Sequence, residues 1–233
     1  MGVLRTKAGP RRLLWLLAAL PLASGAALVV HILSHISLGL ALLVASVIVV
    51  VIGGFAWTRL TATARDTVEQ RIQVGLVAGF LATLAYDSSR WIIVTLFHDT
   101  FWPFDVFPIF GYAIAGSSIP HNVATIIGIL YHYTNGVLFA IAYTILFAPR
   151  GWWAGILWAL GLEALMLAIY PGWLHPRTFS EFVSVSMLGH IAYGSVLGSF
   201  SQQTLQWQKK LFDSRNQTLE GGRKHATTTE RSD

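Results

Sequence analysis

The chain has 233 residues, of which 54% are hydrophobic and only 12% are charged, and its mean hydropathy is +0.58. Soluble globular domains carry about 25% charged residues, so this composition excludes an ordinary soluble protein and predicts a chain that resides in a lipid bilayer. The formal net charge of +5 comes from basic residues between and outside apolar runs, which favours a topological role over nucleic-acid binding, and the lack of cysteine excludes disulfides, thiolate metal sites and cysteine nucleophiles.

Six apolar runs are each long enough for a membrane-spanning helix of about 20 residues. They cover roughly 13–33, 37–57, 72–97, 122–147, 152–170 and 182–200. The sequence therefore predicts an all-α polytopic fold, with a transmembrane domain over 13–200 between a basic arm at 1–12 and a tail at 201–233. A cleaved signal peptide is an alternative for the first run. A retained helix is favoured because the apolar sequence continues unbroken through Val30.

Basic residues gather on one side of the six predicted spans. Fourteen of the 16 Lys and Arg residues lie in the arm, the 58–71 loop, the 148–151 turn and the tail. Arg177 lies on the other side, and Arg90 falls inside the third span. Because Lys and Arg are enriched in cytoplasmic loops, we expect both termini in the cytoplasm of a bacterial inner membrane.

The segments outside the spans differ in character. The tail at 201–233 is polar and rich in Thr and Gln, which predicts a disordered cytoplasmic end. The outer loops at 98–121 and 171–181 combine proline with many aromatic residues. Aromatic rings prefer the headgroup level of a bilayer, so we expect an ordered cap there, partly re-entrant.

The second half of the chain carries a pattern that predicts a two-helix repeat. A shift of 76 residues lays the third span on the fifth, and a shift of 58 lays the fourth on the sixth. The coincident residues are then Asp87 with Glu163, His132 with His190, Gly79 with Gly155, Gly136 with Gly194, and Ala140 with Gly198. Both copies run in the same direction, which predicts a pseudo-twofold bundle of helices three to six. The small residues are explained by close helix packing alone.

The acids and histidines of this repeat are the main candidates for function. At about 1.5 Å per residue, all four lie between the bilayer midplane and the outer leaflet, where charged groups are costly. We expect Asp87, Glu163, His132 and His190 to converge on one site. Arg90, three residues after Asp87, is an alternative partner for that carboxylate.

Two further polar residues lie one helical turn from the histidines. Asn135 follows His132, and Tyr193 follows His190. Each could fix the tautomer of its histidine or line a cavity, and the alternative for both is a hydrogen bond that packs two helices. We include both in the predicted pathway, together with Arg90 and the four acids and histidines.

Several interpretations of this set remain open. The residues could form a pathway for protons or a solute; His132, His190, Glu163 and Asp87 could bind a divalent metal; or the two histidines could be axial ligands of haem b. They could also be structural only. We favour a small transporter, channel or proton-handling protein over an enzyme. The alternatives are a metal- or haem-binding oxidoreductase subunit and a structural or assembly protein, with the bilayer and a second copy of the chain as expected partners.

Other histidines are weaker candidates. His31 and His35 have the i, i+4 spacing of metal ligands but no acid near them in the sequence. His98, Asp99, His121 and His175 lie in the outer loops, where they could form a metal or pH-sensing site. Solvated side chains are the simpler interpretation for all of them.

The order of features from His132 to Gly194 also carries a family resemblance. These features are His132 on an aromatic-rich helix, the Pro149 turn, Trp153 and Gly155 opening the next helix, the Pro171–Gly172 loop, Glu181, and His190 on the last helix. In this order they resemble the YagU-like group of small bacterial inner-membrane proteins. The resemblance implies a multi-helix inner-membrane protein linked to acid resistance, with no established substrate. It accounts neither for the first two helices nor for Tyr86–Arg90.

Overall fold

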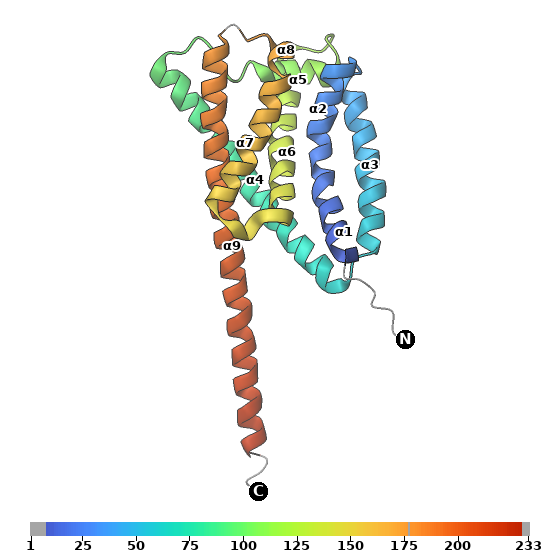
Figure 1. Ribbon diagram of the computed structural model, residues 1–233, viewed down its shortest axis with the longest axis vertical. Helices are drawn as coiled ribbons and strands as arrows, with labels where there is room; N and C mark the ends of the chain where they lie inside the picture. Colours follow the sequence, from blue (N-terminus) through green and yellow to red (C-terminus); the bar gives the residue numbers. More distant parts are fainter. Residues whose placement is uncertain (1–7, 177, 230–233) are drawn as a thin grey trace.

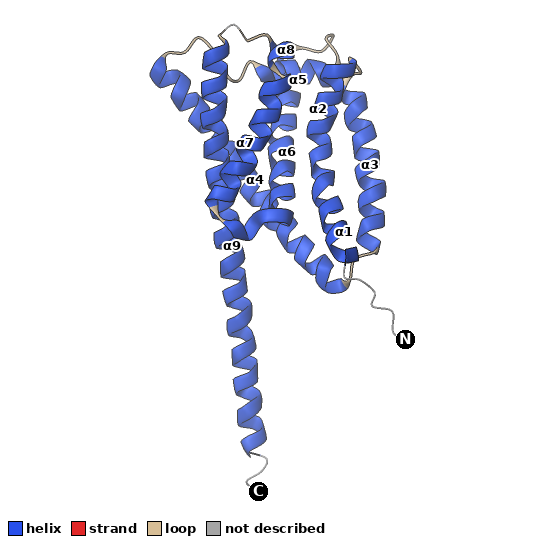
Figure 2. Cartoon of the chain, viewed as in Figure 1, coloured by secondary structure: helices blue, strands red, loops and turns tan. Residues whose placement is uncertain are grey.

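The computed structural model describes residues 8–176 and 178–229, which form helices and connecting loops without any strand (Figures 1 and 2). The predicted all-α fold is therefore confirmed. In chain order the elements are α1 (Ala8–Ala19), η1 (Leu20–Leu22), α2 (Ala23–Ser34), α3 (Leu38–Thr58), α4 (Ala62–Phe97), α5 (Val106–Ala115), α6 (His121–Phe147), η2 (Ala148–Arg150), α7 (Trp152–Ile169), α8 (Pro171–Leu174) and α9 (Phe179–Thr229).

Five helical segments are long and apolar enough to cross a membrane. They are Arg12–Ser34, Leu38–Thr58, His121–Arg150, Trp152–Ile169 and Phe179–Ser214, and they match five of the six predicted runs. The remaining run, 72–97, lies in α4, whose 36 residues form one helix that slants across the bundle (Figure 1). This run contains two charged residues, Asp87 and Arg90, which lower its hydropathy.

The N-terminal run and α3 form a hairpin on one side of the bundle (Figure 1). Pro21 lies in η1, the single 3-10 turn that joins α1 to α2. This fits the missing amide hydrogen of proline, which breaks the regular α-helical bonding. The side chains of Leu43, Val47 and Val51 on α3 are exposed, as expected for a helix that faces lipid.

The core is built by α4, α6, α7 and α9. The α4 helix packs along both α6 and α9, and α7 packs along α9, whereas α6 and α7 touch only briefly. Glycine makes the close approaches: a Cβ on Gly79 of α4 would lie 2.7 Å from Ala140 Cβ of α6, and one on Gly155 of α7 would lie 2.9 Å from Gly198 Cα of α9. The contacts α4–α9 and α6–α7, which a twofold axis would make equivalent, are thus unequal.

Two segments predicted to lack regular structure are helical. The α4 helix begins at Ala62 within the predicted 58–71 loop, and Thr61 caps it by accepting a hydrogen bond from the Ala64 amide. The α9 helix continues through the predicted disordered tail to Thr229. The tail has no proline and extends a helix already nucleated in the bundle, so it avoids the cost of starting a new helix. Gln70 of α4 donates to Gln208 at 2.7 Å, so packing continues beyond residue 201.

The predicted outer cap contains a short helix. The α5 helix packs against α6 and buries Phe107 and Phe110. A Cβ on Gly111 would overlap the backbone of Ala124, so glycine is required for this approach. The cap covers the end of the bundle that carries the α2–α3 and α8–α9 connections (Figure 1).

Candidate functional site

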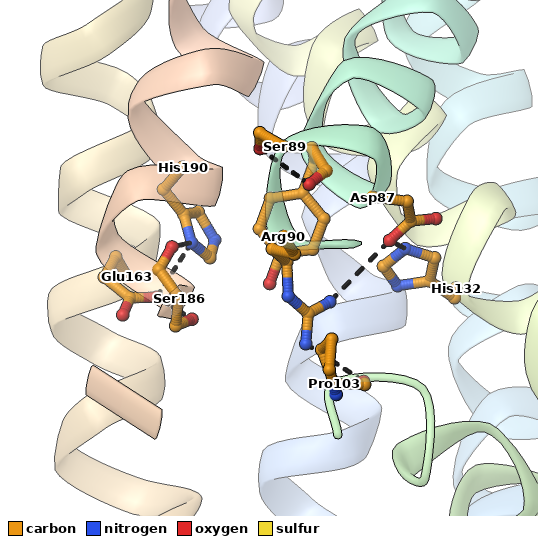
Figure 3. A network of polar contacts seen from close by, with 9 residues as sticks. Asp87, Ser89, Arg90, Pro103, His132, Glu163, Ser186 and His190 are labelled. Atoms are coloured by element: carbon orange, nitrogen blue, oxygen red, sulfur yellow. Dashed lines mark hydrogen bonds and ion pairs between the residues drawn. The ribbon is translucent and has the colours of Figure 1, made fainter. Parts of the chain in front are cut away.

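One predicted acid and one predicted histidine meet between α4 and α6. His132 Nε2 lies 3.1 Å from Asp87 Oδ1, and the Asp87 residue is 8% exposed (Figure 3). A carboxylate only accepts hydrogen bonds, so an ionised Asp87 requires His132 to donate from Nε2. The other ring nitrogen, Nδ1, then has no hydrogen-bond partner among the described residues.

The second acid and histidine meet between α7 and α9. His190 Nδ1 lies 2.8 Å from Glu163 Oε2 and 3.0 Å from the backbone oxygen of Ser186. A backbone oxygen can only accept, so Nδ1 carries a hydrogen and Nε2 is the free nitrogen. The Ser186 hydroxyl donates to Glu163 Oε2 at 3.0 Å. Glu163 is 2% exposed, and its Oε1 has no partner within 8–176 and 178–229.

Arg90 lies between the two pairs in Figure 3. Its Nη1 is 3.6 Å from Asp87 Oδ1, and its Nη2 donates to the Pro103 backbone oxygen at 3.0 Å. The guanidinium carbon also lies 4.6 Å from the centre of the Tyr86 ring, a cation–π contact. Asp87 therefore interacts with both predicted partners, His132 and Arg90. Arg90 is 5% exposed, and its Nε has no partner in the described part of the chain.

Tyr86 separates the two acid–histidine pairs. Its ring centre is 5.8 Å from that of His132 and 4.9 Å from that of His190. Gly189 makes room for this ring, because a Cβ there would lie 2.8 Å from Tyr86 Cε2. The acids and histidines thus form two neighbouring pairs, each within its own helix pair, and the expectation of one four-residue cluster is not met.

Nowhere in the described ranges do three or more His, Asp or Glu side chains form a group that could hold a metal. The predicted ligands His132, His190, Glu163 and Asp87 are divided two and two by the Tyr86 ring. The metal and haem b interpretations stay predictions.

A cavity of about 830 Å³ lies beside the pairs, between α2, α4, α5, α6, α7 and α9. Five of the seven predicted pathway residues line it: Arg90, His132, Asn135, His190 and Tyr193. Asp87 and Glu163 do not line it. The acids therefore lie behind the histidines and hold the two rings in place by hydrogen bonds.

Asn135 and Tyr193 form hydrogen bonds with residues other than His132 and His190. Asn135 Oδ1 accepts a hydrogen bond from the Ser24 hydroxyl of α2 at 2.6 Å, and the Tyr193 hydroxyl donates to the Gly136 backbone oxygen at 2.6 Å. Both bonds join different helices, which matches the packing alternative. The partners that orient the histidines are Asp87 and Glu163 instead.

The weaker histidine candidates have structural contacts. His31 Nδ1 lies 2.6 Å from the Ile36 backbone oxygen, and His121 Nδ1 lies 3.3 Å from the Tyr112 hydroxyl. His35, His98 and His175 each end a helix in the left-handed conformation. Asp99 has no ion pair with any of them in the part of the chain that the structure describes.

Sequence reasoning missed Ser186 and the contribution of α2. Ser186 lies one helical turn before His190, and this i, i+4 spacing is a signal that could have found it. Tyr86 directly precedes Asp87 in the third span, but its position between the pairs depends on how α4 crosses α9. Nothing in the sequence of α2 indicates that Gly25, Ala26 and Val29 line the cavity.

The fold and site define a helical membrane protein with a mostly apolar cavity flanked by acid–histidine pairs. No protein-family model, curated protein or solved structure matches the chain. The resemblance to the YagU-like group accordingly stays a prediction, and function must be argued from the site itself.

Proposed function

We propose that this protein is a small transport protein of the bacterial inner membrane that moves protons through its acid–histidine pairs. The observation that carries the proposal is that His132 and His190 both line one cavity while each is held by a carboxylate outside it, at 3.1 and 2.8 Å. Histidine is the side chain best suited to gain and lose a proton near neutral pH.

The proton chemistry follows from the ring nitrogens. In each pair one nitrogen donates to the acid and the other is free to accept a proton from the cavity. The imidazolium that forms is stabilised by its carboxylate, and the proton leaves when the ring returns to neutral. Glu163, with Oε1 unpartnered and Oε2 beside His190, can itself hold the proton. Arg90 balances the charge of Asp87 when His132 is neutral.

The proposal includes six spans, with α4 as the sixth, and a duplicated helix pair. Its support is a set of matched contacts that obey the shifts of 76 and 58 residues. The matched pairs are Gly79–Ala140 with Gly155–Gly198, Gly75–Thr144 with Gly151–Gln202, and Asp87–His132 with Glu163–His190. The α4–α9 contact is closer than the α6–α7 contact that a pseudo-twofold axis would pair with it. We attribute this difference to the cavity, which residues of both α6 and α7 line.

The proposed orientation has both termini in the cytoplasm. It is supported by the 14 basic residues on the side of the arm and the tail. In this orientation the cavity and the aromatic cap lie toward the outside.

Proton flux in proteoliposomes tests the proposal. Under an imposed potassium diffusion potential, the luminal pH should change faster in liposomes that contain the protein than in empty liposomes. Glu163→Gln should remove most of this added rate. Glu69→Gln, at an exposed acid of α4 outside the cavity, is the matched control and should conduct like the wild type. Equal rates for wild type and Glu163→Gln, or for wild type and empty liposomes, would overturn it.

A further inference from the structure

We propose that the cavity binds a long-chain carboxylic acid, with its carboxylate against Arg90 and its hydrocarbon chain between α2 and α7. This inference rests on the proposed function in one respect, since binding of the anion takes up a proton at the same histidines that carry the proton flux. The binding site itself is argued from the walls of the cavity.

The first observation is an incompletely bonded buried cation. Arg90 lines the cavity, is 5% exposed, and has an Nε without a partner among the described residues. Its carboxylate neighbour, Asp87, is 3.6 Å away and is shared with His132 at 3.1 Å. A buried donor without an acceptor is costly, and a planar carboxylate is the acceptor that guanidinium binds best.

The second observation concerns the charge of the site. Arg90 and Asp87 cancel, and Asp105 and His175 also line the cavity, so an added anion needs a further positive charge close by. His132 Nδ1 and His190 Nε2 are the ring nitrogens not held by an acid, and both residues line the cavity. A proton taken up by either ring supplies the charge. Binding of a carboxylate is therefore coupled to proton uptake.

The third observation is the apolar side of the cavity. Aliphatic residues of three helices line the cavity, namely Ala26, Val29 and Val30 of α2, Ile109 of α5, and Leu162, Leu165 and Met166 of α7. Such a wall offers nothing to a small hydrophilic anion. It buries a hydrocarbon chain at about 0.8 kcal/mol for each CH₂ group.

The rim of the cavity indicates how the chain enters. Val30 is 46% exposed and Leu165 is 55% exposed, and both line the cavity from helices that do not pack on each other. In a bilayer, exposed aliphatic side chains at this depth face the lipid acyl chains. A volume of about 830 Å³ falls within the range of about 300–1,000 Å³ typical of small-molecule sites, which is far more than a proton pathway alone requires.

Binding of dodecanoate to the protein in nanodiscs tests the inference separately from proton flux. We expect saturable binding of one dodecanoate per chain, with proton uptake seen by a pH-sensitive dye in weak buffer. Dodecan-1-ol, which has the chain without the charge, and acetate, which has the charge without the chain, should each bind at least about tenfold more weakly.

Two variants assign the site. Arg90→Gln should weaken dodecanoate binding at least about tenfold, and Arg59→Gln, at an exposed arginine outside the cavity, should not. Because a buried arginine also supports folding, Val29→Trp provides a second test, since it fills the cavity and leaves Arg90 intact; it should weaken binding while the elution profile stays that of the wild type. Dodecan-1-ol binding as tight as dodecanoate, or unchanged binding in both Arg90→Gln and Val29→Trp, would overturn the inference. Proton flux without dodecanoate binding would contradict only the inference, and binding without flux only the proposed function.

Discussion

Glu163 and His190 meet between α7 and α9 with 2.8 Å between Oε2 and Nδ1, and the glutamate is 2% exposed. A carboxyl group this deeply buried is costly unless it is paired or protonated. Its contacts with Ser186 and His190 leave Oε1 without a partner in the described residues. The two helices around the pair therefore hold it together.

Glu163→Ala should destabilise the protein. It removes the acceptor of the Ser186 and His190 bonds and leaves a cavity, with an expected loss of about 3 kcal/mol in the free energy of unfolding. Thermal unfolding in detergent measures this as a lower midpoint. Glu69→Ala, at an exposed acid on α4, should leave the midpoint unchanged. Equal midpoints for the two variants would mean that the Glu163 contacts contribute nothing.

Asp87 and Arg90 should be energetically coupled. Asp87→Asn leaves the buried guanidinium without its counter-charge, whereas Asp87→Asn combined with Arg90→Gln removes both charges. The loss of stability in the double variant should be smaller than the sum of the two single losses by about 1 kcal/mol or more. A double-mutant cycle on unfolding midpoints provides the value. Additive losses would show that the 3.6 Å ion pair has no net effect.

The α7–α9 contact should depend on one glycine and not on its neighbour in the same helix. A Cβ on Gly155 would meet the backbone of Gly194 and Gly198, whereas one on Gly161 meets nothing within 4 Å. Gly155→Leu should therefore destabilise the protein by about 2 kcal/mol or more, and Gly161→Leu should be tolerated. Size-exclusion profiles after heating compare the two. A stable Gly155→Leu protein would be inconsistent with the close crossing.

The sequence predicts individual helices better than it predicts the contacts between them. Five of the predicted runs are confirmed as helices long and apolar enough to cross a membrane, because each is a continuous apolar run that the sequence reveals directly. The acids and histidines were identified because charged groups are rare in such runs. Their division into two pairs was not predicted, since it depends on Gly189 letting the Tyr86 ring lie against α9. The helical tail was missed because low hydropathy indicates exposure and does not exclude a helix that the bundle has already started.

Cysteine labelling should establish whether α4 is the sixth span. The natural sequence contains no cysteine, so single variants report without background. Asp66 lies near the start of α4 and Thr100 lies just beyond its end, and both are exposed. In intact cells a membrane-impermeant maleimide should label Thr100→Cys at once and Asp66→Cys only after permeabilisation. Labelling of both from one side would exclude a spanning α4.

The proton flux of a His132→Gln, His190→Gln double variant tests the central claim most directly. Both rings line the cavity and each is held by an acid, so the double variant removes the two acid-paired histidines that the account makes the proton carriers. His121→Gln, at an outer-cap histidine, is the matched control. We predict that the double variant, eluting as the folded wild type does, falls to the rate of empty liposomes while His121→Gln conducts normally. A folded double variant that conducts at the wild-type rate would contradict the account.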